Sequence, residues 1–192
     1  MITDIVLPKG NEAEFIAMAK RLGYDSLVFL YQGTPPKTDS SVVHVIPVKL
    51  VSAKEFLRQK TKELVAVVSS ELDRAVLERG TTMMFAFELQ ERKDFLHQRA
   101  SGLNHVLCQI AAKKNVKIGF SFSTILNTAG VQRAAIMGRM MQNMFLCKKY
   151  KTQIVIGSFA TNPFEMRSPL DLQAFFMQLG LHPVEAKKAM QW

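Results

Sequence analysis

The sequence contains few cysteines and no long apolar run, and these absences limit its class. Cys108 and Cys147 each lie within an apolar helical pattern, which predicts free buried thiols in a reducing compartment. Two distant cysteines without CxxC spacing favour neither a disulfide nor a zinc site. No apolar run approaches about 18 residues, and the first residues lack the basic and apolar regions of a secretory signal. We therefore expect a cytoplasmic protein that does not contact a membrane.

The sequence also lacks the spacings that metal centres and common nucleophiles require. Its four histidines occur singly, without an HxH, HxxH or HExxH pair: His44, His97, His105 and His182. Between the fifth and seventh predicted strands the only acids are Glu88, Glu91 and Asp94. Neither a Gly-rich phosphate loop after the first predicted strand nor a GxSxG motif is present. We expect no catalytic residue, no metal site and no cofactor bound by this chain.

Acidic residues are scarce in the second half of the chain. Residues 1–90 carry 11 basic and 11 acidic residues, so the whole net charge of +9 falls on residues 91–192, which carry 14 basic (25 − 11) and 5 acidic (16 − 11) residues. Clustered Lys and Arg displace the counterions that condense on a polyanion. This asymmetry favours a nucleic-acid partner over a merely basic surface. The lack of a basic amphipathic terminal helix argues against a membrane surface.

The sequence does contain a regular alternation of β-like and helix-like runs. The predicted strands span residues 4–7, 26–31, 42–48, 64–68, 83–87, 116–122 and 153–157. The predicted helices span 12–22, a segment opened by a capping box at 52–55, 70–80, 101–115, 132–149 and 168–180. Such alternation predicts a parallel sheet covered by helices, either a doubly wound sheet or a barrel. We expect an α/β, TIM-barrel-like incomplete barrel of about seven parallel strands with surrounding helices, formed by residues 1–192 as a single domain.

Residues 99–122 carry the most informative pattern. Ser101 is expected to cap a helix, and the apolar residues that follow form one buried stripe: Leu103, Val106, Leu107, Ile110 and Ala111. Asn104 and His105 fall outside this stripe, in the first helical turn. In a βα barrel this turn lies at the upper rim, the end where the strands finish. There the two side chains either cap and pack locally or contact RNA or a partner protein.

A second pattern follows the seventh predicted strand. Arg167 directly precedes a helix that Ser168 opens at the N-cap, with Pro169 at the first helical position. Barrels often hold phosphate in this region, at a helix amino terminus. The alternative is a capped helix with an exposed arginine, and the sequence leaves both interpretations open.

The long helix predicted over 132–149 is rich in methionine. The methionines recur at helical spacing, which favours core filling over a Met-rich docking groove. Arg139, Gln142 and Lys149 share the other side of the helix. We expect that side to face solvent or RNA.

Two separated blocks of the sequence resemble a known family. Ser101–Leu107 with the strand that follows, and Arg167–Leu172, resemble ribonuclease P protein component 3, the family of the eukaryotic thirty-kilodalton subunit. Residues 185–190 also resemble the closing helix of that family, so the specific resemblance covers roughly the second half of the chain. Because no disordered basic tail follows, the chain is similar to the archaeal form. The resemblance implies a PHP-like incomplete barrel.

The resemblance also implies a function. It implies a non-catalytic, RNA-binding subunit of ribonuclease P, the endoribonuclease particle that removes the 5′ leader from precursor tRNA. In that family the catalyst is RNA, and Mg²⁺ is held largely by the RNA. The implied partners are the ribonuclease P RNA, precursor tRNA through the holoenzyme, a small ferredoxin-like subunit and the other subunits. The alternatives are a metal-dependent phosphoesterase on a PHP-like barrel and a stand-alone basic RNA chaperone.

The expected RNA-binding residues are basic side chains of the second half together with polar residues of the two blocks. They are Arg99, Asn104, His105, Lys113, Lys114, Lys117, Arg133, Arg139, Lys149, Arg167 and Ser168. The sequence alone does not distinguish those that face RNA from those that face protein.

Overall fold

The computed structural model describes residues 1–33, 43–59, 62–90, 93–94 and 98–192. Val42, Glu91 and His97, considered above, lie outside these residues. The strands are β1 (Thr3–Val6), β2 (Ser26–Tyr31), β3 (His44–Val51), β4 (Val65–Val68), β5 (Met83–Phe85), β6 (Lys117–Ser121) and β7 (Ile154–Gly157). The helices are α1 (Glu12–Leu22), α2 (Ala53–Arg58), α3 (Asp73–Arg79), α4 (His105–Lys113), α5 (Phe122–Leu126), α6 (Gly130–Lys149), α7 (Pro169–Gln178) and α8 (Pro183–Ala189), with short 3₁₀ helices η1 (Phe87–Leu89) and η2 (Pro163–Glu165).

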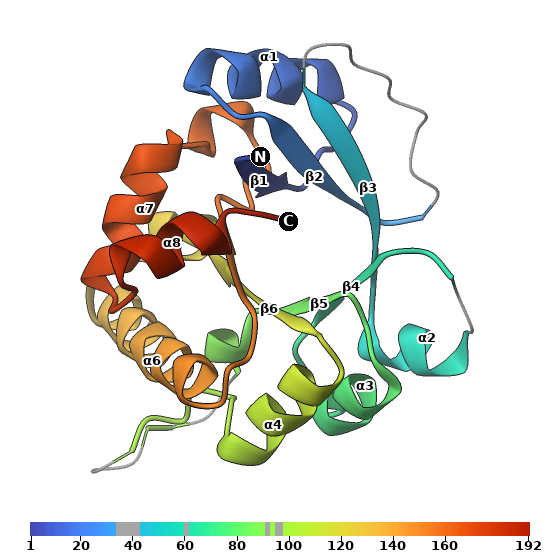
Figure 1. Cartoon of the computed structure of the whole chain (residues 1–192), viewed down its shortest axis with the longest axis vertical. Helices are drawn as coiled ribbons and strands as arrows, with labels where there is room; N and C mark the ends of the chain where they lie inside the picture. The colour runs from blue at the N-terminus through green and yellow to red at the C-terminus, as the bar shows by residue number, and fades with distance from the viewer. Residues whose placement is uncertain (34–42, 60–61, 91–92, 95–97) are drawn as a thin grey trace.

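The seven strands form one sheet in sequence order, and every neighbouring pair is parallel. The helices lie around the outside of the sheet (Figure 1). Each strand is parallel to the next one in the sequence and is joined to it by a crossover connection. A sheet of this kind curves into a nearly closed barrel. The predicted incomplete α/β barrel of seven parallel strands is therefore confirmed.

Two predicted strands extend too far, and in both places a helical turn replaces the last predicted residues. β5 ends at Phe85 because Ala86 has a left-handed φ of 67°, after which η1 begins. β6 ends at Ser121, whose hydroxyl accepts a hydrogen bond from the Thr124 N–H at 3.2 Å and so caps α5. Phe87 and Phe122 therefore belong to helices.

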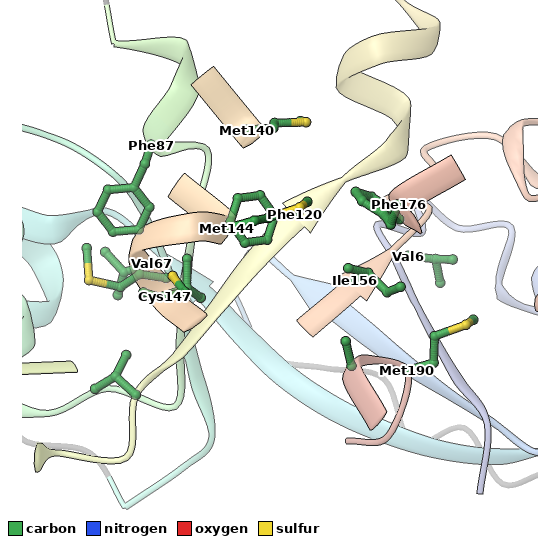
Figure 2. Close-up of a cluster of buried hydrophobic side chains, with 14 of the residues drawn as sticks. Val6, Val67, Phe87, Phe120, Met140, Met144, Cys147, Ile156, Phe176 and Met190 are labelled. Atoms are coloured by element: carbon green, nitrogen blue, oxygen red, sulfur yellow. The ribbon is translucent and has the colours of Figure 1, made fainter. Parts of the chain in front are cut away.

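Two apolar cores lie on either side of the sheet. The outer core lies between strands and helices, and Figure 2 shows part of it, where Phe120 and Ile156 of the sheet share one cluster with Met144 of α6 and Phe176 of α7. The inner core fills the barrel with residues of the strands and of the segment after β7: Ile5, Val28, Leu30, Val48, Ala66, Met83, Phe85, Ala86, Val155 and Phe159. Strands buried on both faces explain why β2 is apolar at almost every position.

The core also contains both cysteines. Cys108 of α4 and Cys147 of α6 are buried free thiols, as the sequence predicts. Among the described residues, every helix is too short or too polar to cross a membrane.

The two ends of the sheet are joined by the chain itself. The N–H of Phe159 donates to the Ile5 carbonyl at 2.7 Å, and the N–H of Leu7 donates to the Ala160 carbonyl at 2.8 Å. The N–H of Thr3 donates to the Met190 carbonyl at 2.8 Å, and the two chain termini lie near one another (Figure 1). β1 is therefore not an open strand edge.

A buried carboxylate stabilises this closure. Asp4 is fully buried, and its carboxylate accepts hydrogen bonds from the Ser158 N–H at 2.6 Å, the Ser158 hydroxyl at 2.7 Å and the Ile5 N–H at 2.8 Å. Gly157 allows this approach, because a Cβ there would lie 3.0 Å from Asp4 Oδ1. Burial raises the pKa of Asp4 to about 6, although the three hydrogen bonds lower it.

Replacing Asp4 by Asn should remove one pH dependence of stability. The folded-state pKa of about 6 exceeds the ordinary value of 3.8. The stabilising contribution is therefore full below a pH of about 4 and is lost as the pH rises to about 6, by about 3 kcal/mol. Urea denaturation should therefore show a smaller decrease in stability between a pH of about 4 and 6 in Asp4→Asn than in the wild-type protein. Glu14→Gln, on the exposed surface of α1, should keep the wild-type dependence; an unchanged dependence in Asp4→Asn would contradict the argument.

Candidate nucleic-acid interface

The upper end of the barrel, where the strands finish, is where barrel enzymes place their chemistry. Among the described residues, no three His, Cys, Asp or Glu side chains lie together as possible metal ligands. Glu88 follows β5 in η1 and is 1% exposed, and neither of its carboxylate oxygens has a hydrogen-bond partner in the described part of the chain. Burial raises the pKa of Glu88 to about 7. The folded protein therefore favours the neutral form of this carboxyl group.

Two of the predicted RNA-binding arginines contact Asp94 instead of standing in solvent. The Arg139 side chain is 13% exposed; its Nε donates to Asp94 at 2.9 Å, and its NH1 donates to the carbonyls of Glu88 and Gln90 at 3.2 and 3.1 Å. Arg99 NH1 lies 3.8 Å from Asp94, and its guanidinium lies against Gly138, where a Cβ would overlap it. These contacts attach Asp94 and Arg99 to α6.

The exposed side of α6 also differs from the prediction. Met141 and Phe145, one helical turn apart, are 47% and 64% exposed, whereas Arg139 is largely buried. Met140 and Met144 are buried in the core, as predicted for the methionines of this helix. The surface of α6 is therefore partly apolar.

The segment before α7 does not present an open anion site. Arg167 NH1 donates to the carbonyls of Phe164 and Met166 at 3.1 and 2.8 Å. Ser168 caps α7 as predicted, accepting from the Asp171 N–H at 3.2 Å, and its hydroxyl donates to the Asp171 carboxylate at 2.7 Å. Because a carboxylate already lies at the positive end of α7, a phosphate there would meet a like charge.

Arg133, near the start of α6, is exposed, and its side chain also donates to a backbone carbonyl of the preceding segment. Its Nε donates to the Thr128 carbonyl at 2.6 Å. The predicted arginines thus share one feature, which is that each guanidinium has a hydrogen-bond or ion-pair partner within the chain.

The start of α4 is capped by Asn104 and not by Ser101. The Asn104 side chain accepts from the Leu107 N–H at 2.9 Å, so of the two interpretations of Asn104 the structure shows local capping, and the predicted Ser101 cap is wrong. Ser101 is buried, and its hydroxyl accepts from Gln142 at 2.7 Å. The predicted apolar stripe is shifted accordingly, since Val106 is exposed whereas Cys108 is buried.

His105 does not lie at the upper rim. Its ring centroid is 6.4 Å from that of Tyr150, which directly follows α6 and precedes β7. Lys149 Nζ lies 5.7 Å from the centre of the same tyrosine ring. The structure therefore brings His105 and Lys149 together near the lower end of the barrel, where the strands begin.

The lysines predicted to bind RNA lie at this lower end. α4 ends at Lys113 and Lys114, β6 begins at Lys117, and α6 ends at Lys149. Lys113, Lys114 and Lys149 are exposed, and Lys117 is half-buried. None of the four forms an ion pair with a described carboxylate. In this sense, the lack of a close ion-pair partner, their charges are uncompensated within the part of the chain that the structure describes.

Three residues at the same end were missed as candidate site residues. Lys151, Lys188 and Trp192 line a cavity beside Lys117. Lys151 belongs to the basic run that ends the long helix, and Trp192 is the sole tryptophan. None of the three residues has a sequence spacing that predicts a binding site.

The fold and the charge distribution define a basic α/β-barrel protein whose uncompensated lysines lie at the lower end. Its sequence matches the family described as RNase P subunit p30 over residues 92–192, more than half of the chain. The chain belongs to this family.

Archaeal proteins are similar in sequence to this chain, and the matches cover different parts of its length. Ribonuclease P protein component 3 of Methanocaldococcus jannaschii is 36% identical over 96 residues, which cover 50% of this chain and 41% of that protein. The protein of the same name from Methanosarcina mazei is 26% identical over 96% of this chain and 82% of its own length.

Solved structures share the fold. A chain from the cryo-EM structure of archaeal ribonuclease P with mature tRNA has a TM-score of 0.80 and 24% identity, covering 97% of this chain and 86% of that chain. The crystal structure of A. niger ochratoxinase has a TM-score of 0.59 and 11% identity, covering 98% of this chain and 69% of that chain. Both similarities support the barrel.

Replacing Glu88 by Gln should stabilise the protein at high pH. Because the folded-state pKa of Glu88 is about 7 against an ordinary 4.5, its contribution to stability is full below a pH of about 4.5 and is lost as the pH rises through about 7. A neutral amide avoids most of this loss, so the free energy of unfolding at a pH of about 8 should rise by about 1–2 kcal/mol. Denaturation at a pH of about 5 should show little difference. The exposed Glu71→Gln should be neutral at both values, and a destabilised Glu88→Gln at the higher pH would contradict the expected buried charge.

Proposed function

We propose that this chain is an RNA-binding protein subunit of an archaeal-type ribonuclease P, which supports the catalytic RNA in 5′ leader removal from precursor tRNA. Family membership supports the particle, and the uncompensated lysines of the lower end carry the RNA-binding part of the proposal. Lysine ammonium groups without carboxylate partners can neutralise phosphates and release their counterions. The chain would act as a single domain in the cytoplasm.

The lower end is the surface that we assign to RNA. Lys113, Lys114 and Lys149 are exposed there, and His105 lies beside the ring that Lys149 also contacts. The arginines bonded to carbonyl groups, Arg139 and Arg167, would instead maintain the shape of the chain around α6 and α7. In this proposal Mg²⁺ is held by the RNA of the holoenzyme.

A small ferredoxin-like subunit is the proposed protein partner. Pairing of the exposed edge of β1 does not support this contact, because the chain joins β1 to the segment after β7 through its own backbone hydrogen bonds. The exposed apolar pair on α6, Met141 and Phe145, supports a protein contact at this helix instead.

The purified chain should not cleave precursor tRNA with Mg²⁺ or Mn²⁺. This follows from the proposal that the particle's RNA supplies the catalyst, and gel analysis of labelled precursor tRNA would measure it. Addition of the cognate RNA and subunits should restore cleavage. Metal-dependent cleavage that co-purifies with the chain and is lost in Glu88→Ala would favour the alternative, a phosphoesterase on the same barrel.

Removing the lower-end lysines should reduce the salt dependence of RNA binding. The triple variant Lys113→Gln, Lys114→Gln, Lys149→Gln would lose up to three phosphate contacts, each worth about 0.7 to 0.9 in the slope of log affinity against log salt. Filter binding of the ribonuclease P RNA at several salt concentrations would measure the slope, which should become shallower by about 2.

The matched control changes exposed lysines of the charge-balanced half, Lys9, Lys20 and Lys54, to Gln. This control has the same net charge as the triple variant and should keep a slope within about 0.7 of the wild-type value, less than one phosphate contact. Equal slopes in the two triple variants would show that the lower end does not contact phosphate.

A further inference from the structure

A cavity of about 510 Å³ opens at the lower end of the barrel, beside the starts of β6 and β7. Its walls come from separate parts of the chain: the end of α6, the 151–153 connection, α8 and residues 191–192. Cavities that bind small molecules in proteins have about this size, roughly 300–1,000 Å³. The cavity is therefore large enough for a nucleotide.

The charge lining the cavity is strongly positive. Lys117, Lys148, Lys151 and Lys188 line it, against one acidic side chain, Glu185. Lys148 Nζ is bonded to the Glu185 carboxylate at 2.8 Å and to the Gly180 carbonyl at 3.0 Å. This ion pair neutralises the Glu185 carboxylate and one of the four ammonium groups. Three ammonium groups then remain without a carboxylate partner among the described residues.

Lys117 is the most unusual of the three. It is half-buried, and its ammonium lies 4.0 Å from the centre of the Trp192 ring, with no described carboxylate in ion-pair contact. Burial lowers its pKa. A bound anion would compensate a cation that the fold has partly removed from water.

Trp192 gives the cavity an aromatic wall. The indole packs against the inner core of the barrel, so it is held by the fold as well as by Lys117. An aromatic ring next to several ammonium groups is the combination that binds single-stranded nucleotides, through base stacking and phosphate neutralisation together.

We propose that this cavity is a nucleotide-binding site, in which Lys117, Lys151 and Lys188 hold the phosphate and Trp192 contacts the base. The nucleotide is a free nucleoside phosphate or an unpaired nucleotide of an RNA; the RNA source rests on the proposed function. Phosphate contacts here would be separate from those of Lys113, Lys114 and Lys149, which do not line the cavity.

The sole tryptophan makes the site directly observable. Titration of the whole chain with adenosine or uridine 5′-monophosphate should change the Trp192 fluorescence with saturation. Lys188→Gln should weaken this binding about tenfold, because it removes one charge-assisted contact. The neighbouring Lys187→Gln is the matched control: it lies exposed on the same helix, does not line the cavity, and should stay within about twofold of the wild type.

Other probes separate the parts of the proposal. Inorganic phosphate should bind more weakly than either nucleotide, and equal affinity would overturn the role of Trp192. If an RNA supplies the nucleotide, a single-stranded oligonucleotide should saturate the signal at a lower concentration than the monophosphates. No saturable signal with any probe would overturn the site. In that case, if the wild-type chain still binds the ribonuclease P RNA on a filter, only the cavity site is overturned and the proposed function stands. If the wild-type chain does not bind this RNA at all, the proposed function itself is contradicted.

Discussion

The closure of the barrel depends on the contact between Asp4 and Ser158. One carboxylate accepts three hydrogen bonds from residues on both sides of the seam between β1 and the segment after β7. The seam then aligns Phe159 and Ala160 with β1, and Phe159 turns its ring into the inner core, 5.0 Å from that of Phe85. With seven strands instead of eight, the missing strand is replaced by this short segment. The arrangement explains a glycine at 157 and a serine at 158 without any role in catalysis.

The same structure separates two kinds of basic residue. The arginines at 99, 133, 139 and 167 donate to carboxylates or backbone carbonyls of their own chain, which suits a planar group with five donors. The lysines at the lower end are point charges on flexible stems, and most have no acidic neighbour. The sequence shows both as one basic half, but the fold assigns the arginines to internal contacts and leaves most of these lysines without an ion pair among the described residues.

Much of the barrel could be predicted from the sequence, because strands and helices are set by local patterns. The bounds of α1 and β2, and the caps at Ser52 and Ser168, follow from such patterns and are confirmed. The start of α4 was not predictable in this way. Ser101 and Asn104 are both good caps, and the choice depends on Gly102, whose φ of 84° and close approach to the Phe87 carbonyl place Ser101 in the core. The role of Arg139 could not be predicted either, since its partners Glu88, Gln90 and Asp94 lie at least 45 positions away in sequence. The same holds for the contact of Arg99 with Gly138 of α6.

The position of the uncompensated positive charge bears on the orientation in which the chain would approach a polyanion. Barrel enzymes place their sites at the carboxyl ends of the strands, and that end here contains a buried carboxyl group, Glu88, and arginines with internal partners. The uncompensated lysines, and the cavity that Trp192 lines, lie at the opposite end. A polyanion is attracted to the end where positive charge is not already neutralised, and long-range attraction favours approach in that orientation. We infer that the amino-terminal ends of the strands face the RNA, which leaves the partly apolar surface of α6 for a protein neighbour.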